Sequence, residues 1–281
     1  MNRGQEQANR DQATIEGFGD EWHAFDQSEL SNNELERHFA MYFRVFRWDL
    51  VSENSIGFDM GCGSGRWDKL LAPRIGHLHC IDPSAKALDV ARRSLANMHN
   101  VTFHHAGVAD ILLPRNSMDF GVSLGVLHHV PDTFAAIRSC VEMLKPGAPL
   151  LLYLYYRFDN RPRWFRTVWA LSDVIRRLVS SMPFWLRVRT TQLLAATVYW
   201  PLARLSWLLE RTGVNISNLP LSSYRNNSFY AMRTDALDRF GTRLEHRFTR
   251  AEIGAMLTSA GCANIIFSPR EPFWCVCATK N

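Results

Sequence analysis

Three glycines at alternate positions form the segment of this chain best suited to hold a ligand. The segment runs Asp59-Met60-Gly61-Cys62-Gly63-Ser64-Gly65, directly after an apolar run and directly before a helical pattern. Glycine lets the backbone turn sharply and approach a ligand closely, because a β-carbon would collide there. Dinucleotide-binding loops have the spacing G-x-G-x-x-G, which puts the third glycine one residue later. The spacing observed here therefore favours a different nucleoside cofactor.

Polar residues follow three further runs that are predicted to be strands. Asp82 ends the run from His77, and Asp110 lies in the turn Gly107-Val108-Ala109-Asp110. His128 and His129 come shortly after Leu124, which ends another run. A carboxylate can accept two hydrogen bonds from a vicinal diol, and histidine titrates near physiological pH. The pattern therefore offers a diol-binding acid and a pair of candidate bases.

The elements that must position these residues alternate between β-rich runs and helical patterns, which is typical of parallel βαβ units. After a basic middle stretch, the capping box Thr249-Arg250-Ala251-Glu252 predicts one more helix, followed by a strand hairpin. We therefore expect an α/β fold with a doubly wound, mostly parallel, seven-stranded sheet. An N-terminal helix is predicted over residues 34–50. The predicted strands lie near 56–60, 77–82, 101–104, 118–124, 149–155, 263–268 and 273–278.

With these motifs in this order, the sequence resembles the class I S-adenosylmethionine-dependent methyltransferases that act on small molecules. The resemblance covers about residues 55–156 and 249–279, and includes Leu144-Lys145-Pro146-Gly147 before the fifth strand. It implies a Rossmann-like methyltransferase fold, S-adenosylmethionine as cofactor, and methyl transfer to a natural product, sugar or lipid-linked acceptor. It implies that Asp82 holds the ribose hydroxyls and that Ala109 and Asp110 form the adenine-binding turn. The implied cofactor-binding residues are Asp59, Gly61, Gly63, Gly65, Asp82, Ala109, Asp110 and Leu124.

Structural roles compete with these assignments. The glycines can form a plain tight turn, and Asp82 and Asp110 can cap turns or helices, where Asp is favoured. Methyl transfer needs a base only when the acceptor loses a proton, and His128, His129 and Tyr155 are the candidate catalytic residues. Alternatively, one histidine packs on the cofactor and the other caps the helix near Pro131. The pattern is compatible with oxygen, nitrogen or carbon as the acceptor atom.

The middle of the chain has a composition of its own. From Arg157 to Arg250 there are 16 Arg, no Lys and 6 acidic residues, whereas the whole chain has a net charge of +5. Apolar residues recur at helical spacing in two stripes, which we expect to be buried in a helical cap over the acceptor pocket. A solvated basic face, a membrane-interface contact, an anionic small substrate and RNA remain alternative explanations. The stripes are Trp164, Val168, Leu171, Ile175 and Leu178, then Leu194, Val198, Pro201 or Leu202, Leu205 and Leu209.

We therefore divide the chain into an N-terminal helical lid (1–54), a cofactor-binding core (55–156), a helical insertion (157–248) and a C-terminal helix with strands (249–281). The lid would include Trp22. The six cysteines are scattered, which argues against a metal site or a disulfide framework. The polar N-terminus lacks the apolar core of a signal peptide, so the cytoplasm is the expected compartment. No particular oligomeric state is indicated.

Two further functions stay open at this point. The first is a non-catalytic S-adenosylmethionine-binding or scaffold protein that uses the insertion for partner contacts. The second is an RNA methyltransferase that uses the basic insertion, although no recognised RNA-binding module accompanies it. The segment after the fourth predicted strand lacks the Asn/Asp-Pro-Pro-Tyr/Phe tetrapeptide of amino-adenine methyltransferases.

Overall fold

The computed structural model describes residues 9–110 and 113–281. The chain forms two compact units. The sheet unit comprises the residues up to Gln27, Leu35–Arg157 and Leu244–Asn281, and the helical unit comprises Ser28–Glu34 and Phe158–Arg243. Among the described residues, no helix is both long enough and apolar enough to cross a membrane.

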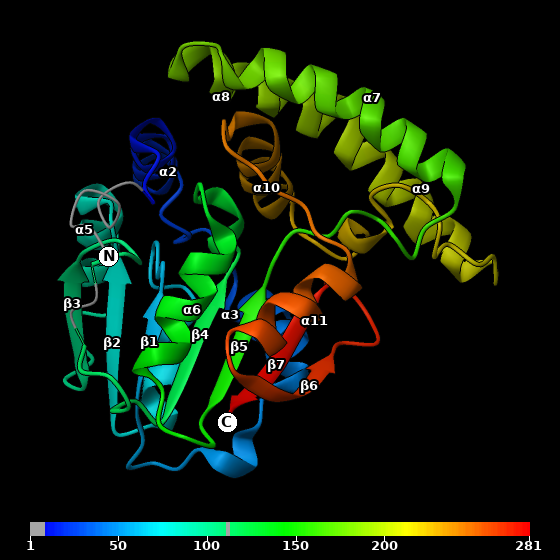
Figure 1. The fold of residues 1–281 in the computed structure, drawn as a ribbon. Helices are drawn as coiled ribbons and strands as arrows, with labels where there is room; N and C mark the ends of the chain where they lie inside the picture. Colours follow the sequence, from blue (N-terminus) through cyan, green and yellow to red (C-terminus); the bar gives the residue numbers. More distant parts are fainter. Residues whose placement is uncertain (1–8, 111–112) are drawn as a thin grey trace. The chain divides into compact units, whose positions relative to one another are not determined.

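The sheet unit contains the predicted seven-stranded sheet, which confirms the fold expected from the sequence (Figure 1). The strand order is β3-β2-β1-β4-β5-β7-β6, in which β1 to β5 are parallel and β7 is antiparallel to both of its neighbours. Parallel strands bring their carboxyl ends to the same edge, where open α/β sheets bind ligands. The strands are β1 (Ile56–Met60), β2 (His77–Asp82), β3 (Val101–His105), β4 (Phe120–Leu124), β5 (Pro149–Tyr153), β6 (Cys262–Phe267) and β7 (Cys275–Lys280).

Helices cover both faces of this sheet. On one face, α6 (Thr133–Met143) and α11 (Arg250–Ser259) share a core cluster with Phe58, Leu150 and Val276. The capping box predicted at the start of α11 is present. Helix α3 lies behind the other face (Figure 1). The remaining helices are α2 (Gln12–Ala24), α3 (Asn32–Tyr42), α4 (Asp68–Leu71) and α5 (Ala85–Ser94).

The predicted helix over residues 34–50 is wrong in its second half. Helix α3 ends at Tyr42, and two 3-10 turns follow, η1 (Phe43–Val45) and η2 (Trp48–Leu50). Between these turns Phe46 adopts an extended conformation and contacts Trp48 edge-on, with ring centroids 4.8 Å apart. Phe46 also contacts Phe120 of β4. Packing of these aromatic rings against the sheet therefore overrides the helical periodicity.

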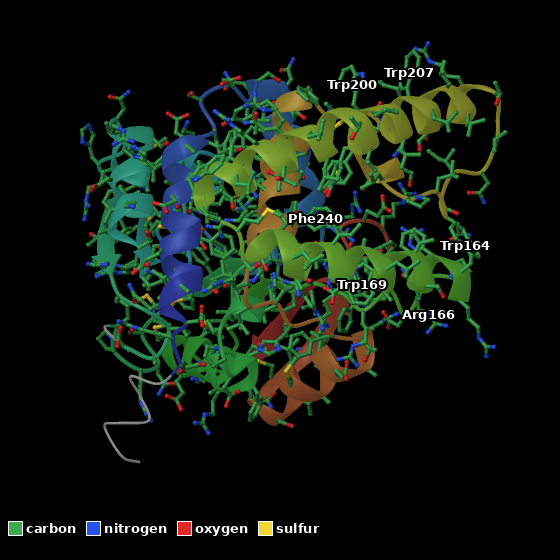
Figure 2. The ribbon with its side chains drawn as sticks, turned by 90° about the horizontal axis from the view of Figure 1, so that it is seen from above. Trp164, Arg166, Trp169, Trp200, Trp207 and Phe240 are labelled. Atoms are coloured by element: carbon green, nitrogen blue, oxygen red, sulfur yellow. The ribbon has the colours of Figure 1, made fainter. Side chains whose placement is uncertain are left out.

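The helical unit contains more helices than the two predicted from the apolar stripes. It consists of α7 (Arg163–Ser180), α8 (Phe184–Leu194), a π-helical turn (Ala195–Tyr199), α9 (Trp200–Arg211), a 3-10 turn (Ser222–Tyr224) and α10 (Phe229–Gly241). Helix α10 begins at Ser228, whose side chain accepts a hydrogen bond from the Ala231 N–H. Helix α10 packs against both α7 and α8, and Figure 2 shows it passing beneath the run from α8 to α9. Their shared core contains Val179, Ala195, Tyr199, Ala203, Met232, Ala236 and Phe240.

Two glycines let β1 and β4 pack tightly against each other. A β-carbon at Gly121 would overlap the fully buried ring of Phe58, and one at Gly57 would overlap the ring of Phe120. Gly121→Ala should therefore lower the free energy of unfolding by about 1 to 3 kcal/mol through overpacking. Gly254→Ala is the matched control, because Gly254 lies in α11 with open space around it, and alanine should be neutral or stabilising there. Thermal denaturation of both variants tests this, and equal melting temperatures would contradict it.

Candidate functional site

The loop after β1 adopts a conformation that requires its three glycines. Gly61, Gly63 and Gly65 have φ angles of +83°, +55° and +73°, which side chains with a β-carbon rarely adopt. The N–H groups of Gly61 and Cys62 both donate to the Ile81 carbonyl of β2, at 2.7 and 3.1 Å. The loop is therefore held against the end of the neighbouring strand.

Asp82, the last residue of β2, is buried and already accepts two hydrogen bonds. Its Oδ2 accepts from the Gly63 N–H at 3.0 Å, and its Oδ1 accepts from the Ser84 N–H at 2.8 Å. A carboxylate has about four lone-pair sites, so two remain for a further donor pair. Burial raises the pKa of Asp82 to about 6, although both backbone donors oppose this shift. The remaining acceptor sites of the Asp82 carboxylate therefore match the two hydroxyl donors of a ribose diol.

Asp59, in β1, has a different environment from Asp82. It is buried beside Asp68 of α4, and the Cys80 thiol donates to Asp68 Oδ2 at 3.4 Å. Burial, followed by the neighbouring Asp68 carboxyl, raises the pKa of Asp59 well above its ordinary range. Burial likewise raises the pKa of Asp68. Asp59 therefore lies in β1 as a buried acid, and its predicted role in cofactor binding stays a prediction.

The loops after β3 and β4 hold the remaining predicted cofactor residues. Asp110 Oδ2 accepts from the Gly107 N–H at 2.9 Å, which closes the turn that contains Ala109. Leu124 is buried at the end of β4, and the next residue, Gly125, has a φ angle of +81°. The four loops follow neighbouring parallel strands, so their predicted site residues lie at one edge of the sheet (Figure 1).

The N-terminal segment contacts each of these four loops. A β-carbon at Gly63 would lie 3.0 Å from the Trp22 indole nitrogen, and Lys86 in α5 pairs with Asp20 at 2.5 Å. Arg10 forms an ion pair with Asp110, and Asn9 Nδ2 donates to the Asp132 carbonyl at 2.9 Å. Within this segment, Trp22 therefore lies against the glycine-rich loop. Sequence reasoning singled out only Trp22, because contacts across about a hundred residues leave no local pattern.

The three predicted catalytic residues lie together at the ends of β4 and β5. The ring centroids of His128 and Tyr155 are 3.9 Å apart, and those of His128 and His129 are 4.0 Å apart. His129 Nδ1 lies 2.7 Å from the Leu244 carbonyl oxygen. Because a carbonyl only accepts, this contact places a proton on Nδ1, so that in the neutral imidazole the lone pair is on Nε2. Burial lowers the pKa of His128 well below its ordinary value, so this imidazole is neutral.

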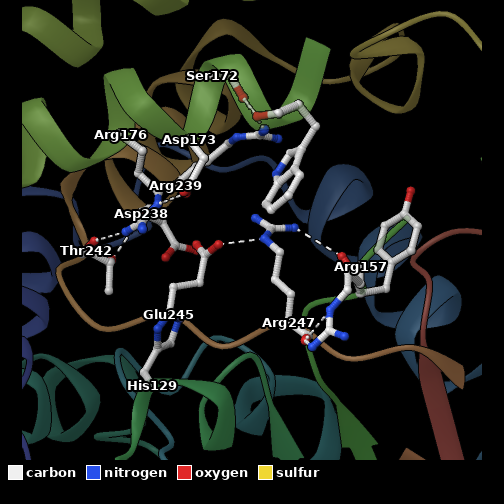
Figure 3. Close-up of polar contacts among 12 residues, drawn as sticks. His129, Arg157, Ser172, Asp173, Arg176, Asp238, Arg239, Thr242, Glu245 and Arg247 are labelled. Atoms are coloured by element: carbon white, nitrogen blue, oxygen red, sulfur yellow. Dashed lines mark hydrogen bonds and ion pairs between the residues drawn. The ribbon is translucent and has the colours of Figure 1, made fainter. Parts of the chain in front are cut away.

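A charged pair that sequence reasoning missed lies beside this cluster. Arg247 Nε donates to Glu245 Oε1 at 2.6 Å (Figure 3). The Arg247 guanidinium lies 5.1 Å from the centroid of the Tyr155 ring. The segment that carries this pair is hydrogen-bonded to the site backbone, since the His246 N–H donates to the His128 carbonyl and the Phe248 N–H to the Tyr155 carbonyl, each at 2.9 Å. This pairing, together with the His129–Leu244 contact, brings residues 244–248 to the site.

Comparison with known proteins decides the family. A family model described as a methyltransferase domain matches residues 58–152. The ubiquinone biosynthesis O-methyltransferase of Xanthomonas campestris pv. campestris is 30% identical over 174 residues, which cover 56% of this chain and 72% of the relative. This chain is a class I S-adenosylmethionine-dependent methyltransferase. The resemblance inferred from the motifs is thereby confirmed.

Other relatives and solved structures agree with the methyltransferase family and fold. The demethylmenaquinone methyltransferase of Listeria monocytogenes is 35% identical over 106 residues, which cover 36% of this chain and 44% of the relative. A methyltransferase in complex with the Haloferax volcanii Trm112 activator has a TM-score of 0.51 at 14% identity, and covers 95% of this chain and 96% of its own. A methyltransferase of Methanosarcina mazei has a TM-score of 0.50 at 19% identity, and covers 83% and 95%. At these identities the two structures support the fold alone.

S-adenosylmethionine is therefore the cofactor of this methyltransferase, and it supplies a methyl group on a sulfonium centre. The observed site fits it in two ways. The left-handed φ angles of Gly61, Gly63 and Gly65 suit a close approach of a ligand to the loop backbone, and the buried Asp82 carboxylate has acceptor capacity for two hydroxyl groups. The individual residue assignments remain predictions, which the next two experiments test.

The pKa of Asp82 predicts a pH dependence of cofactor binding. Ribose hydroxyls donate to the ionised carboxylate, so protonation of Asp82 below a pKa of about 6 must oppose binding. The affinity for S-adenosylhomocysteine should fall about tenfold between pH 7.5 and pH 5, measured by calorimetry. Asp82→Ala should weaken binding by about 1.5 to 3 kcal/mol and remove the pH dependence. An affinity that does not change with pH would contradict this role.

Gly63→Val should abolish cofactor binding by the methyltransferase. The β-branched side chain would meet Trp22 and force a valine into a left-handed conformation within the loop. Gly147→Val is the matched control, because Gly147 has a φ angle of +80° but a β-carbon added there would meet nothing within 4 Å. The control should lose stability through the same strain and yet keep its affinity for S-adenosylhomocysteine. Equal affinities of the two variants would show that the loop is only a turn.

Proposed function

We propose that this methyltransferase methylates an oxygen of a small acceptor that carries a hydroxylated ring. The observation that carries this proposal is the aromatic cluster of His128, His129 and Tyr155, with one imidazole held in a defined tautomer by the Leu244 carbonyl. Relatives named for ubiquinone biosynthesis O-methylation and for demethylmenaquinone methylation support a small-molecule acceptor of this class.

Methyl transfer from a sulfonium requires little covalent chemistry from the protein. Displacement at a sulfonium has a good leaving group, so holding the nucleophile in line with the methyl group supplies much of the catalysis. A ring hydroxyl must also lose its proton, and the Nε2 lone pair of His129 is suited to accept it. The Arg247 guanidinium beside Tyr155 would favour negative charge as it develops on the acceptor oxygen.

We further propose that the helical unit selects the acceptor. Its chain leaves the sheet unit just after β5, at Tyr155 and Tyr156, and the carboxyl ends of parallel strands open onto the ligand site. In this proposal, the segment that follows β5 in the sequence contributes to the choice of substrate.

Radiolabelled methyl transfer tests the acceptor class. The methyltransferase should label hydroxylated benzoquinols and catechols, with or without an isoprenoid tail, in preference to ring compounds whose hydroxyl groups are already methylated. Total RNA serves as the competing substrate in the same assay. Labelling of RNA without labelling of any phenolic compound would replace this proposal with the RNA methyltransferase considered from the sequence.

His129→Asn should lower kcat by about a hundredfold or more while leaving the affinity for S-adenosylhomocysteine unchanged. Asparagine can still donate to the Leu244 carbonyl through its amide, but it lacks the Nε2 base. His77→Asn is the control, because His77 lies at the opposite end of β2 from Asp82 and contacts Thr102. Normal turnover by His129→Asn, or an unchanged dependence of kcat on pH, would assign His129 a packing role only.

A further inference from the structure

Helix α7 exposes the apolar stripe that the sequence led us to expect in a core. Trp164, Val168, Leu171, Ile175 and Leu178 recur at intervals of four and three residues, which places them on one side of the helix. Leu171 and Leu178 are 65% and 63% exposed, and Trp164 is 50% exposed. The expectation that this stripe is buried is therefore wrong.

The orientation of α7 is fixed by polar contacts on its inner side. Arg176, which is only 8% exposed, donates to Asp173 Oδ1 at 2.6 Å and to the Thr242 carbonyl at 2.9 Å (Figure 3). Arg239 of α10 donates to Ser172 Oγ at 3.1 Å. A rotation of α7 that buried the leucines would break its hydrogen bonds to Thr242 and Arg239, which is costly. The helix thus faces inward with Arg176 and with Val179 of the shared core, and its apolar stripe faces outward.

The charged residues from the second half of α7 to α9 are almost all basic. From Val174 to Leu209 the sequence has five Arg and no Lys, Asp or Glu. The single acid of α7, Asp173, is paired with Arg176 and Arg177. Arg163, Arg166 and Arg177 are exposed and lie off the apolar stripe, and Figure 2 shows Arg166 on the side of α7 away from α9. A net positive surface therefore borders the exposed leucines.

Helices α8 and α9 show the same combination of residues. Trp185 and Leu193 are exposed on α8, and Trp200 is exposed on α9. The Arg204 guanidinium lies 4.0 Å from the Trp200 ring, and Arg211 lies 3.5 Å from the Trp207 ring. Tryptophan and arginine are both amphipathic side chains that suit a boundary between apolar and aqueous phases.

We propose that α7 lies flat in the interface of a membrane that contains anionic lipids. The leucine-rich side would enter the acyl boundary, and the arginines would contact the headgroups. An RNA ligand would leave the aliphatic side chains of α7 exposed to water. An acidic protein segment would match the positive charge of the arginines but would not cover the leucines. This inference goes beyond the proposed function and does not depend on the identity of the acceptor.

Vesicle co-sedimentation with the full chain tests this inference. The protein should bind vesicles of 70% phosphatidylcholine and 30% phosphatidylglycerol more tightly than vesicles of phosphatidylcholine alone. Leu171→Gln together with Leu178→Gln should lower the partition coefficient at least about tenfold. Leu50→Gln is the control, because Leu50 is an exposed leucine of the sheet unit, 43% exposed, and should leave binding unchanged.

A second pair of variants tests the charge. Arg163→Gln and Arg166→Gln should each lower binding to the anionic vesicles about fivefold, with little effect on neutral vesicles. Raising the salt concentration should have the same selective effect, because it screens exposed charges.

Two results would overturn the inference. One is the absence of vesicle binding by protein that is folded by circular dichroism. The other is a concentration-dependent dimer, seen by analytical ultracentrifugation, that the double leucine variant dissociates, since a second copy would then cover the stripe. Calorimetry with S-adenosylhomocysteine on the same samples reports on the methyltransferase site separately, so failure of one proposal is distinguishable from failure of the other.

Discussion

The hydrogen bond from the Gly63 N–H to the Asp82 carboxylate joins the loop after β1 to the end of β2, and much of the cofactor site depends on it. Parallel pairing of β1 and β2 places Met60 beside Ile81, so the loop begins where β2 is about to end. The left-handed glycines then turn the chain back over the sheet edge. The carboxylate is thus fixed by the protein backbone before any ligand arrives, which limits the entropy lost on binding.

The same edge of the sheet gathers residues of very different chemistry. Buried acids lie in β1 and α4, on either side of the glycine-rich loop in the sequence, whereas the segments after β4 and β5 carry two histidines and Tyr155. This separation suits methyl transfer from a sulfonium, in which the cofactor needs polar contacts and the acceptor needs a water-poor site with a base. The parallel sheet supplies the separation, because each loop follows a different strand.

The helical unit exposes more of its large apolar side chains than the sheet unit does. The sheet unit buries its apolar residues between sheet and helices, as globular domains normally do. In the helical unit, α7 buries Val179 in the shared core and also buries Arg176, whereas it exposes leucines and a tryptophan. A buried arginine is tolerated only where it is paired, and the Asp173–Arg176 contact provides that pairing. An exposed apolar stripe of this size marks an interaction surface.

The sequence by itself determined the sheet and the cofactor loop. Strand runs, the glycine spacing and Asp82 at the end of β2 are set by local periodicity and turn chemistry, so they could be read without contacts between distant residues. Only the tertiary structure placed Arg10 against Asp110 and the Glu245–Arg247 pair beside Tyr155, because these residues meet across long stretches of chain. It also decided which side of α7 is buried. A helical stripe shows that two sides differ, but the hydrogen bonds of Arg176 and Arg239 to residues elsewhere in the helical unit decide which side faces inward.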